Sequence, residues 1–155
     1  MEIRAANIPG DVPAVRALFL EYAGAIGIDL CFQRFEEELA TLPGLYAAPA
    51  GRLLVACEAD GLVGSVALRP LTGGVCEMKR LYIRPEYRGG GIGRRLVRRL
   101  LDEAADAGYS RMVLDTLPAM REAIGLYRSM GFVDTEPYYA GPSGALFFSR
   151  ELKRA

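Results

Sequence analysis

The residues most able to bind a ligand form a glycine-rich turn, Arg88-Gly89-Gly90-Gly91-Ile92-Gly93-Arg94, which we expect between a strand and a helix. Three consecutive glycines allow several backbone N–H groups to converge, and a helix that begins there adds the positive end of its dipole. The turn therefore predicts an anion site that suits a phosphate. The alternative is a tight turn without a ligand, in which Arg98 and Arg99 pair with Asp102 and Glu103.

Two common phosphate-binding motifs do not fit this turn. A P-loop needs Lys and then Ser or Thr after its last glycine, whereas Arg94 and Arg95 follow Gly93 here. The glycines cannot be aligned with G-x-G-x-x-G, and the preceding strand belongs to a predicted meander rather than to the first βαβ unit of a dinucleotide-binding fold. An anion site of another kind remains the better interpretation.

Acid–base chemistry must rely on carboxylates, tyrosines or backbone groups, because the chain contains no histidine. That absence removes the Ser-His-Asp and Cys-His arrangements and the commonest neutral metal ligand. The three cysteines, Cys31, Cys57 and Cys76, are far apart without a C-x-x-C spacing, so we predict neither a disulfide framework nor a metal site. A reducing, cytoplasmic location is expected.

The composition is that of a globular domain with no overall charge. The chain has 155 residues, of which 51% are hydrophobic, and 19 Lys and Arg balance 19 Asp and Glu. No general cationic surface is available for nucleic acid or membrane lipid, and no apolar run approaches the ~18 residues of a membrane span. Without a repeat, a linker or an export signal, residues 1–155 are predicted to form a single domain.

Hydrophobic periodicity predicts the elements that position these residues. In the first half, Asp11 and Pro13 are expected to open a helix, because Asp caps free amides and Pro fits a first turn. Tight turns and alternating apolar residues then indicate an antiparallel meander. The elements expected here are a strand at 3–5, helices at 11–26 and 35–42, and strands at 53–59, 62–69 and 75–83.

The second half alternates helices and strands. A helix follows the glycine-rich turn and stops at Gly108, and a last helix begins near Thr116 and Pro118 and ends at Gly131. Strands are expected at 111–115, 132–135 and 145–152. A meander combined with two helical crossovers predicts an α/β fold whose mixed, mostly antiparallel central sheet is flanked by helices.

Two motifs together resemble a known family. The run Arg88-x-x-Gly91-x-Gly93 looks like the acyl-CoA pyrophosphate loop of the GNAT superfamily of N-acetyltransferases. Further along, Ala123-x-x-Leu126-Tyr127-x-x-x-Gly131-Phe132 resembles that superfamily's last helix and the turn into its next strand. The resemblance implies a GNAT-like sheet, splayed at the acyl-CoA site, and an enzyme that moves acetyl from acetyl-CoA to a primary amine by direct attack in a ternary complex.

The resemblance also implies a cofactor site. Backbone amides of the glycine-rich turn would hold the pyrophosphate, and the end of the preceding strand would bind the pantetheine arm as an added strand. That strand and the strand at 112–115 must then splay apart. GNAT enzymes often carry Asn before the last helix, where this chain offers only the hydroxyl of Thr116. The expected cofactor-binding residues are Leu81, Tyr82, Ile83, Arg88, Gly89, Gly90, Gly91, Ile92, Gly93, Arg94 and Thr116.

Tyr127 matches the tyrosine that in many GNAT enzymes protonates the departing CoA thiolate. The alternative is a core tyrosine, because Tyr127 shares a helical stripe with Ala123, Leu126 and Met130. A phenol with a pKa of ~10 is a weak acid toward a thiolate whose thiol has a pKa of ~8.5. Tyr127 must therefore donate its proton as charge develops, or have a lowered pKa.

Glu77 is the expected base, since its offset from Arg88 is similar to that of the strand glutamate that acts as base in some GNAT enzymes. The alternative is a structural ion pair with Lys79 on the same strand face, or with Arg80 if a bulge shifts the phase. Cys76 adjoins Glu77 but has no specified cationic partner, so we interpret it as a small buried hydrophobe and not as a nucleophile.

The acceptor is expected to be a small-molecule amine or an amino acid. The resemblance implies that its pocket lies between the first two helices and the late strands, where aromatic rings would attract an amine by cation–π interaction. The acidic run at 36–38 is interpreted as a solvated helix face. The expected acceptor-binding residues are Tyr22, Phe32, Gln33, Tyr138 and Tyr139.

Two other functions stay open at this point. A non-catalytic acyl-CoA sensor would need neither Glu77 nor Tyr127, and the presence of both favours the enzyme. A protein N-acetyltransferase is the second alternative. The neutral net charge counts against a nucleic-acid partner. The resemblance to the GNAT superfamily also suggests a homodimer built on the late strands.

Overall fold

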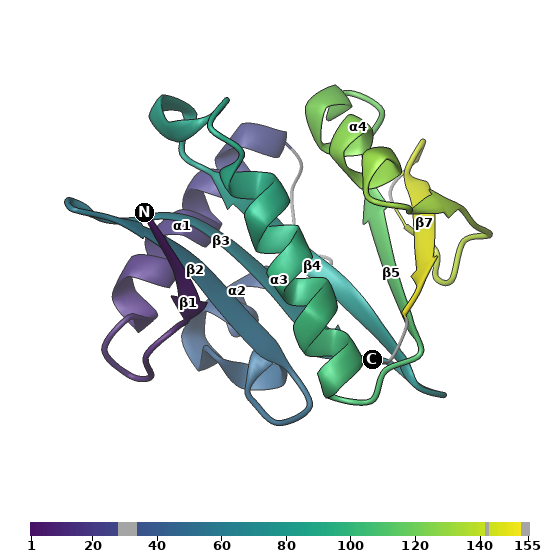
Figure 1. The fold of residues 1–155 in the computed structure, drawn as a ribbon, viewed down its shortest axis with the longest axis horizontal. Helices are drawn as coiled ribbons and strands as arrows, with labels where there is room; N and C mark the ends of the chain where they lie inside the picture. The colour runs from purple at the N-terminus through teal and green to yellow at the C-terminus, as the bar shows by residue number, and fades with distance from the viewer. Residues whose placement is uncertain (28–33, 142, 153–155) are drawn as a thin grey trace.

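A seven-stranded sheet runs through the molecule in the order β1-β2-β3-β4-β5-β7-β6 (Figure 1). The computed structural model describes residues 1–27, 34–141 and 143–152. Neighbouring strands are antiparallel except β4 and β5, which are parallel, so the predicted mixed, mostly antiparallel α/β sheet is confirmed. The strands are β1 (Glu2–Ala5), β2 (Arg52–Glu58), β3 (Gly61–Pro70), β4 (Val75–Ile83), β5 (Arg111–Thr116), β6 (Val133–Asp134) and β7 (Leu146–Glu151).

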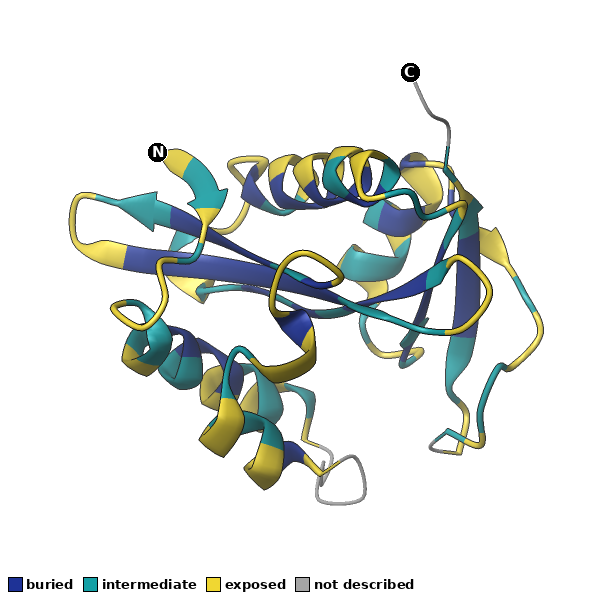
Figure 2. Cartoon of the chain, turned by 90° about the horizontal axis from the view of Figure 1, so that it is seen from below, coloured by how far each residue is buried: buried dark blue, intermediate teal, exposed yellow. Residues whose placement is uncertain are grey.

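Helices cover both faces of this sheet, as Figure 2 shows from below. Helices α3 (Ile92–Asp106) and α4 (Arg121–Ser129) lie on one face, and α1 (Val12–Ile26) and α2 (Phe35–Thr41) lie on the other. Short 3-10 turns, η2 (Gly44–Tyr46) and η3 (Pro85–Tyr87), connect them to strands. Each face has its own apolar core, because the buried side chains fall into one cluster with α3 and another with α1.

The last helix begins later than predicted. Helix α4 starts at Arg121, not near Thr116 and Pro118, because β5 continues to Thr116 through its pairing with Leu146 of β7. A turn then follows, closed by a hydrogen bond from the Met120 N–H to the Leu117 carbonyl oxygen. The strand expected at 132–135 is reduced to Val133–Asp134.

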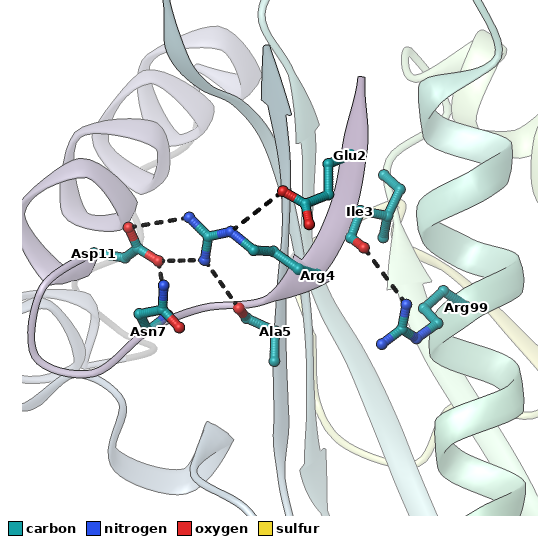
Figure 3. A network of polar contacts seen from close by, with 7 residues as sticks. All are labelled: Glu2, Ile3, Arg4, Ala5, Asn7, Asp11 and Arg99. Carbon is teal, nitrogen blue, oxygen red and sulfur yellow. Dashed lines mark hydrogen bonds and ion pairs between the residues drawn. The ribbon is translucent and has the colours of Figure 1, made fainter. Parts of the chain in front are cut away.

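The N-terminal strand is tied to the first helix by an ion pair (Figure 3). Arg4 Nη1 lies 2.6 Å from Asp11 Oδ2, and the Asn7 N–H donates to the same oxygen at 2.7 Å. Asp11 occupies the N-cap position of α1, but the predicted side-chain cap is wrong because its carboxylate is turned toward Arg4 and Asn7. The hydrogen bond from Arg4 lowers the pKa of Asp11.

Strand β4 changes phase at Arg80. Arg80 has a φ of 63°, in the left-handed region that non-glycine residues seldom adopt, and the pairing with β3 shifts between Ser65 and Ala67. Before this bulge Cys76 and Met78 contribute to the core beside α3, and after it Leu81 and Ile83 pack against the same core. Even-numbered residues before the bulge and odd-numbered residues after it therefore face the same core.

The Arg80 side chain is buried on the face that carries α1 and α2. Arg80 is 3% exposed, and its Nε and Nη2 donate to the Glu38 carboxylate at 2.9 and 2.8 Å. The guanidinium carbon also lies 5.2 Å from the centre of the Phe35 ring and 5.7 Å from that of Tyr22. The interpretation of residues 36–38 as a solvated face is wrong for Glu38, which anchors α2 to the sheet, while Glu36 and Glu37 are exposed.

We expect the Glu38→Gln substitution to lower the free energy of unfolding by about 3 kcal/mol, because it leaves a buried guanidinium without its anion. The exposed Glu36→Gln on the same helix is the matched control and should change it by less than about 0.5 kcal/mol. Urea denaturation of both variants measures the difference. Equal stabilities would show that the Arg80–Glu38 pair does not hold α2 in place.

Candidate functional site

Strands β4 and β5 pair only at their first residues. Val75, Cys76 and Glu77 are matched with Arg111, Met112 and Val113, although β4 continues to Ile83 and β5 to Thr116. Beyond these pairs the two strands diverge (Figure 1), which confirms the predicted splay. Among the described residues, the later part of β4 has no strand partner on this side. Apart from the Ile83 carbonyl oxygen, which accepts a hydrogen bond from Arg88, its backbone groups on this side are therefore available to an extended ligand.

The N-terminus of α3 presents free amides beside this opening. Within the described part of the chain, the backbone N–H groups of residues 89–94 donate to no backbone acceptor, and the first helical bond runs from Arg95 N to Gly91 O at 3.1 Å. Gly89 and Gly91 have φ values of 89° and 83°, which favour glycine. No side chain of the described residues caps the helix. The turn therefore fits an anionic group such as a pyrophosphate.

A cavity of about 510 Å³ joins the turn to the open edge of β4. Most of the expected cofactor-binding residues line it, and Gly90 and Thr116 do not. Thr116 is buried, and its hydroxyl lies 3.6 Å from the Met120 sulfur. The lining residues that were expected are Leu81, Tyr82, Ile83, Arg88, Gly89, Gly91, Ile92, Gly93 and Arg94.

Further lining residues come from the end of α1, from η3, from the turn after β5 and from α4, and were not assigned from the sequence. Ala123 and Leu126 belong to the second motif, where their helical spacing was the available signal. Leu117 and Met120 lie in the turn after β5. The last helix was expected to begin at these positions, so the path of this turn was not predicted. The unassigned lining residues are Ala25, Ile26, Tyr87, Leu117, Ala119, Met120, Glu122, Ala123 and Leu126.

Two of the turn arginines make local contacts. Arg88 Nε donates to the Ile83 carbonyl oxygen at 2.8 Å, and its guanidinium carbon lies 5.5 Å from the centre of the Tyr82 ring. Arg94 Nη2 donates to Ser129 Oγ at 2.9 Å, which links α3 to α4. Farther along α3, Arg99 pairs with Glu103 at 2.7 Å as expected, whereas no Arg98–Asp102 pair is present among the described residues.

Tyr127 is 6% exposed and packs edge-on against Phe132, with ring centres 5.8 Å apart. Burial raises the pKa of its hydroxyl, and the nearby Tyr22 and Asp115 raise it further. A lowered pKa, one of the two expectations for this residue, is therefore wrong. The hydroxyl therefore keeps its proton at neutral pH.

Glu77 is 1% exposed and lies where the pairing of β4 with β5 ends. Its carboxylate accepts hydrogen bonds from Arg69 Nε at 2.7 Å and from Tyr138 Oη at 2.5 Å. Arg69 faces Glu77 across β3 and β4, so neither Lys79 nor Arg80 is its partner. The sequence did not reveal this pair because it depends on the register of the β3–β4 hairpin.

The loop before β7 brings a second tyrosine to a second carboxylate. Tyr139 Oη donates to Asp115 Oδ2 at 2.5 Å, and the rings of Tyr138 and Tyr139 both pack against Phe147. Burial raises the pKa of both tyrosine hydroxyls. Asp115 was not assigned from the sequence, although alternation along β5 places it on the same face as Val113.

The remaining expected acceptor residues divide into two groups. Tyr22 lines the cavity, whereas Phe32 and Gln33 lie outside the described residues.

Cys57 and Cys76 are free thiols. In the described ranges no three His, Cys, Asp or Glu side chains converge on a metal position, and none of the helices there has the length and apolar character needed to cross a membrane.

Comparisons with known proteins agree on one family. Residues 13–132 match the acetyltransferase (GNAT) family. The chain is 43% identical to an uncharacterized N-acetyltransferase of Schizosaccharomyces pombe over 152 residues, 97% of this chain and 93% of that protein. It resembles the crystal structure of a GNAT-family acetyltransferase from Staphylococcus aureus with a TM-score of 0.83 at 19% identity, covering 98% and 99% of the two chains.

A third match carries a ligand. The crystal structure of the PaiA N-acetyltransferase from Thermoplasma acidophilum in complex with coenzyme A has a TM-score of 0.75 at 17% identity. The similarity covers 97% of this chain and 98% of that one. At this identity the likeness concerns the fold alone.

Cys76 should be unreactive in the folded protein, since its side chain is fully buried and burial raises the pKa of its thiol to about 12. Treatment with iodoacetamide at pH 8, followed by peptide mass spectrometry, should find Cys76 alkylated only after denaturation. The partly exposed Cys57 is the internal comparison. Alkylation of Cys76 in the native protein at the rate of Cys57 would contradict its placement in the core.

Proposed function

The chain belongs to the GNAT family of acetyltransferases, and we propose that it transfers acetyl from acetyl-CoA to the primary amine of a small molecule or an amino acid. The membership makes it an N-acetyltransferase that uses acetyl-CoA. The observation that carries the proposal is that a single cavity is bordered by both the open edge of β4 and the uncapped N-terminus of α3.

The two borders of the cavity match the two polar parts of the donor. Backbone amides of residues 89–94 would hold the pyrophosphate, with Arg88 and Arg94 adding positive charge. The backbone of residues 81–83 would bind the pantetheine arm as an additional strand. Acetyl-CoA supplies an acetyl group activated as a thioester. The remaining chemistry is proton transfer by side chains of this chain.

Glu77 is the proposed base. Arg69 and Tyr138 donate to its carboxylate and fix its orientation at the point where β4 and β5 separate. A primary amine is protonated near neutral pH and must lose a proton before it can attack, which a carboxylate can accept directly or through a water molecule.

Tyr127 is the proposed acid. Its raised pKa makes it a weaker acid than a free tyrosine, so we expect it to donate only as negative charge develops on the departing sulfur. The ring is held by Phe132 and Phe148, which leaves the hydroxyl little freedom of position.

Several wider features belong to the same proposal. Tyr22, Tyr138 and Tyr139 are proposed to contact the acceptor, and residues 1–155 to act as one catalytic domain. A homodimer built on the late strands stays a prediction. A cytoplasmic location is proposed as well, and the free thiols of Cys57 and Cys76 support it.

The Arg88→Glu substitution should weaken acetyl-CoA binding about tenfold or more, because it places a negative charge beside the pyrophosphate position. Isothermal titration calorimetry measures this. Arg98→Glu makes the same change of charge at an exposed position of α3 outside the cavity and should bind like the wild type. Equal weakening in both variants, or no binding by the folded wild type, would mean that the glycines form only a turn.

The Glu77→Gln substitution should leave acetyl-CoA affinity unchanged and reduce kcat/KM about 100-fold, mainly at low pH. Below the pKa of the acceptor amine, a base is needed to form the free amine. Above that pKa, the difference in kcat/KM between Glu77→Gln and the wild type should become smaller. The measurement is a pH profile of thiol release with the best amine found in a screen. Tyr138→Phe removes a hydrogen bond but keeps the carboxylate, so its profile should keep the wild-type shape. Equal, pH-independent losses in both variants would leave Glu77 only a structural role.

A further inference from the structure

A layer of charged side chains lies on the sheet face that carries α1 and α2, beside the opening between β4 and β5. Residues paired across a sheet project to the same face, and Arg69 pairs with Glu77 while Ala67 pairs with Lys79. Ala67 belongs to the core beside α1, which fixes the face of Lys79. Val113 pairs with Glu77, and Asp115, two residues later, shares that face.

Most charges in this layer are already paired within the protein. Arg69 binds Glu77 at 2.7 Å, and Arg80 binds Glu38 at 2.8 Å. Lys79 makes no hydrogen bond or ion pair with any described residue, and Asp115 receives only the neutral hydroxyl of Tyr139. Among the described residues, Lys79 and Asp115 are therefore left without a direct ion-pair partner.

Lys79 is held under conflicting influences. It is half-buried, and burial lowers the pKa of its ammonium group, as do the nearby cations Arg80 and Arg69, while the carboxylates of Glu77 and Asp115 raise it. Its ammonium nitrogen is not among the buried atoms that lack a partner, so it keeps access to solvent and an entering anion can reach it. A bound anion would supply the counter-ion that the described residues do not.

We propose that Lys79 binds a carboxylate of the acceptor, so that the acceptor is a zwitterion of the α-amino acid type, with Asp115 attracting its ammonium group. This inference rests on the proposed acetyl transfer to an amine. A molecule with one charge of each sign complements the two charges that lack counter-ions. A polyamine or a lysine side chain of a protein would bring no anion to Lys79.

Steady-state thiol release from acetyl-CoA tests the inference with the common amino acids and their α-carboxamides as acceptors. Each carboxamide keeps the amine and loses the negative charge. At least one amino acid should have a kcat/KM about 10- to 100-fold above that of its carboxamide, the factor expected for a hydrogen bond between charged groups.

Two variants isolate Lys79. Lys79→Met should abolish the preference for the amino acid over its carboxamide, mainly through KM, while acetyl-CoA binding by calorimetry stays unchanged. Lys79→Arg keeps the positive charge and should retain most of the preference. Thermal melting shows whether each variant is folded. If Lys79→Met does not fold, the inference is judged by two results: whether the wild type prefers the amino acid over its carboxamide, and whether Lys79→Arg retains that preference.

The outcomes separate this inference from the proposed function. Carboxamides, polyamines or peptides acetylated as well as amino acids would overturn the role of Lys79 and leave the acetyltransferase standing. A preference that survives in Lys79→Met would do the same. No thiol release with any acceptor, by a wild type that binds acetyl-CoA, would count against the proposed function itself as well as against the zwitterion.

Discussion

Backbone hydrogen bonding between β4 and β5 stops while both strands continue, and the arrangement of the rest of the site follows from that stop. In a continuous parallel sheet, the N–H and C=O groups of β4 would be satisfied by β5. Here the later half of β4 has no partner strand on that side, and the first turn of α3 lies next to the same opening. A ligand with an amide-containing arm and a phosphate end can therefore satisfy groups that the fold leaves without partners.

The bulge at Arg80 connects this opening to the opposite face of the sheet. A left-handed backbone at a non-glycine residue carries strain of about 1–3 kcal/mol, which persists only where neighbouring contacts over-determine it. The two hydrogen bonds to Glu38 and the rings of Tyr22 and Phe35 provide such contacts. Helix α2, far from the glycine-rich turn in sequence, thus contributes to the shape of the strand that borders the cavity.

Local sequence patterns were sufficient for the order of elements and the location of the glycine-rich turn, whereas the splay was expected only from the resemblance to the GNAT superfamily. Alternation and helical spacing act over a few residues, and the turn glycines mark where one pattern ends. Contacts that depend on register or on loop paths were not accessible. Arg69 meets Glu77, and Tyr139 meets Asp115, through strand pairing and a loop that a linear pattern does not define. The start of α4 was misplaced because tertiary pairing extends β5 to Thr116.

The hydrogen bonds of Tyr138 and Tyr139 have a consequence for how such an enzyme diversifies. Both carboxylates beside the opening are oriented by neighbouring residues of one surface loop, whereas the proposed donor-binding groups belong to β4, the glycine-rich turn and the first turn of α3. The two carboxylates with their tyrosines and the proposed donor-binding groups lie on the same sheet but share few side chains. Under the proposed assignment of Tyr138 and Tyr139 to the acceptor, changes in that loop are expected to alter which amine is accepted while leaving the acyl donor the same, so that acceptor choice and donor use evolve separately.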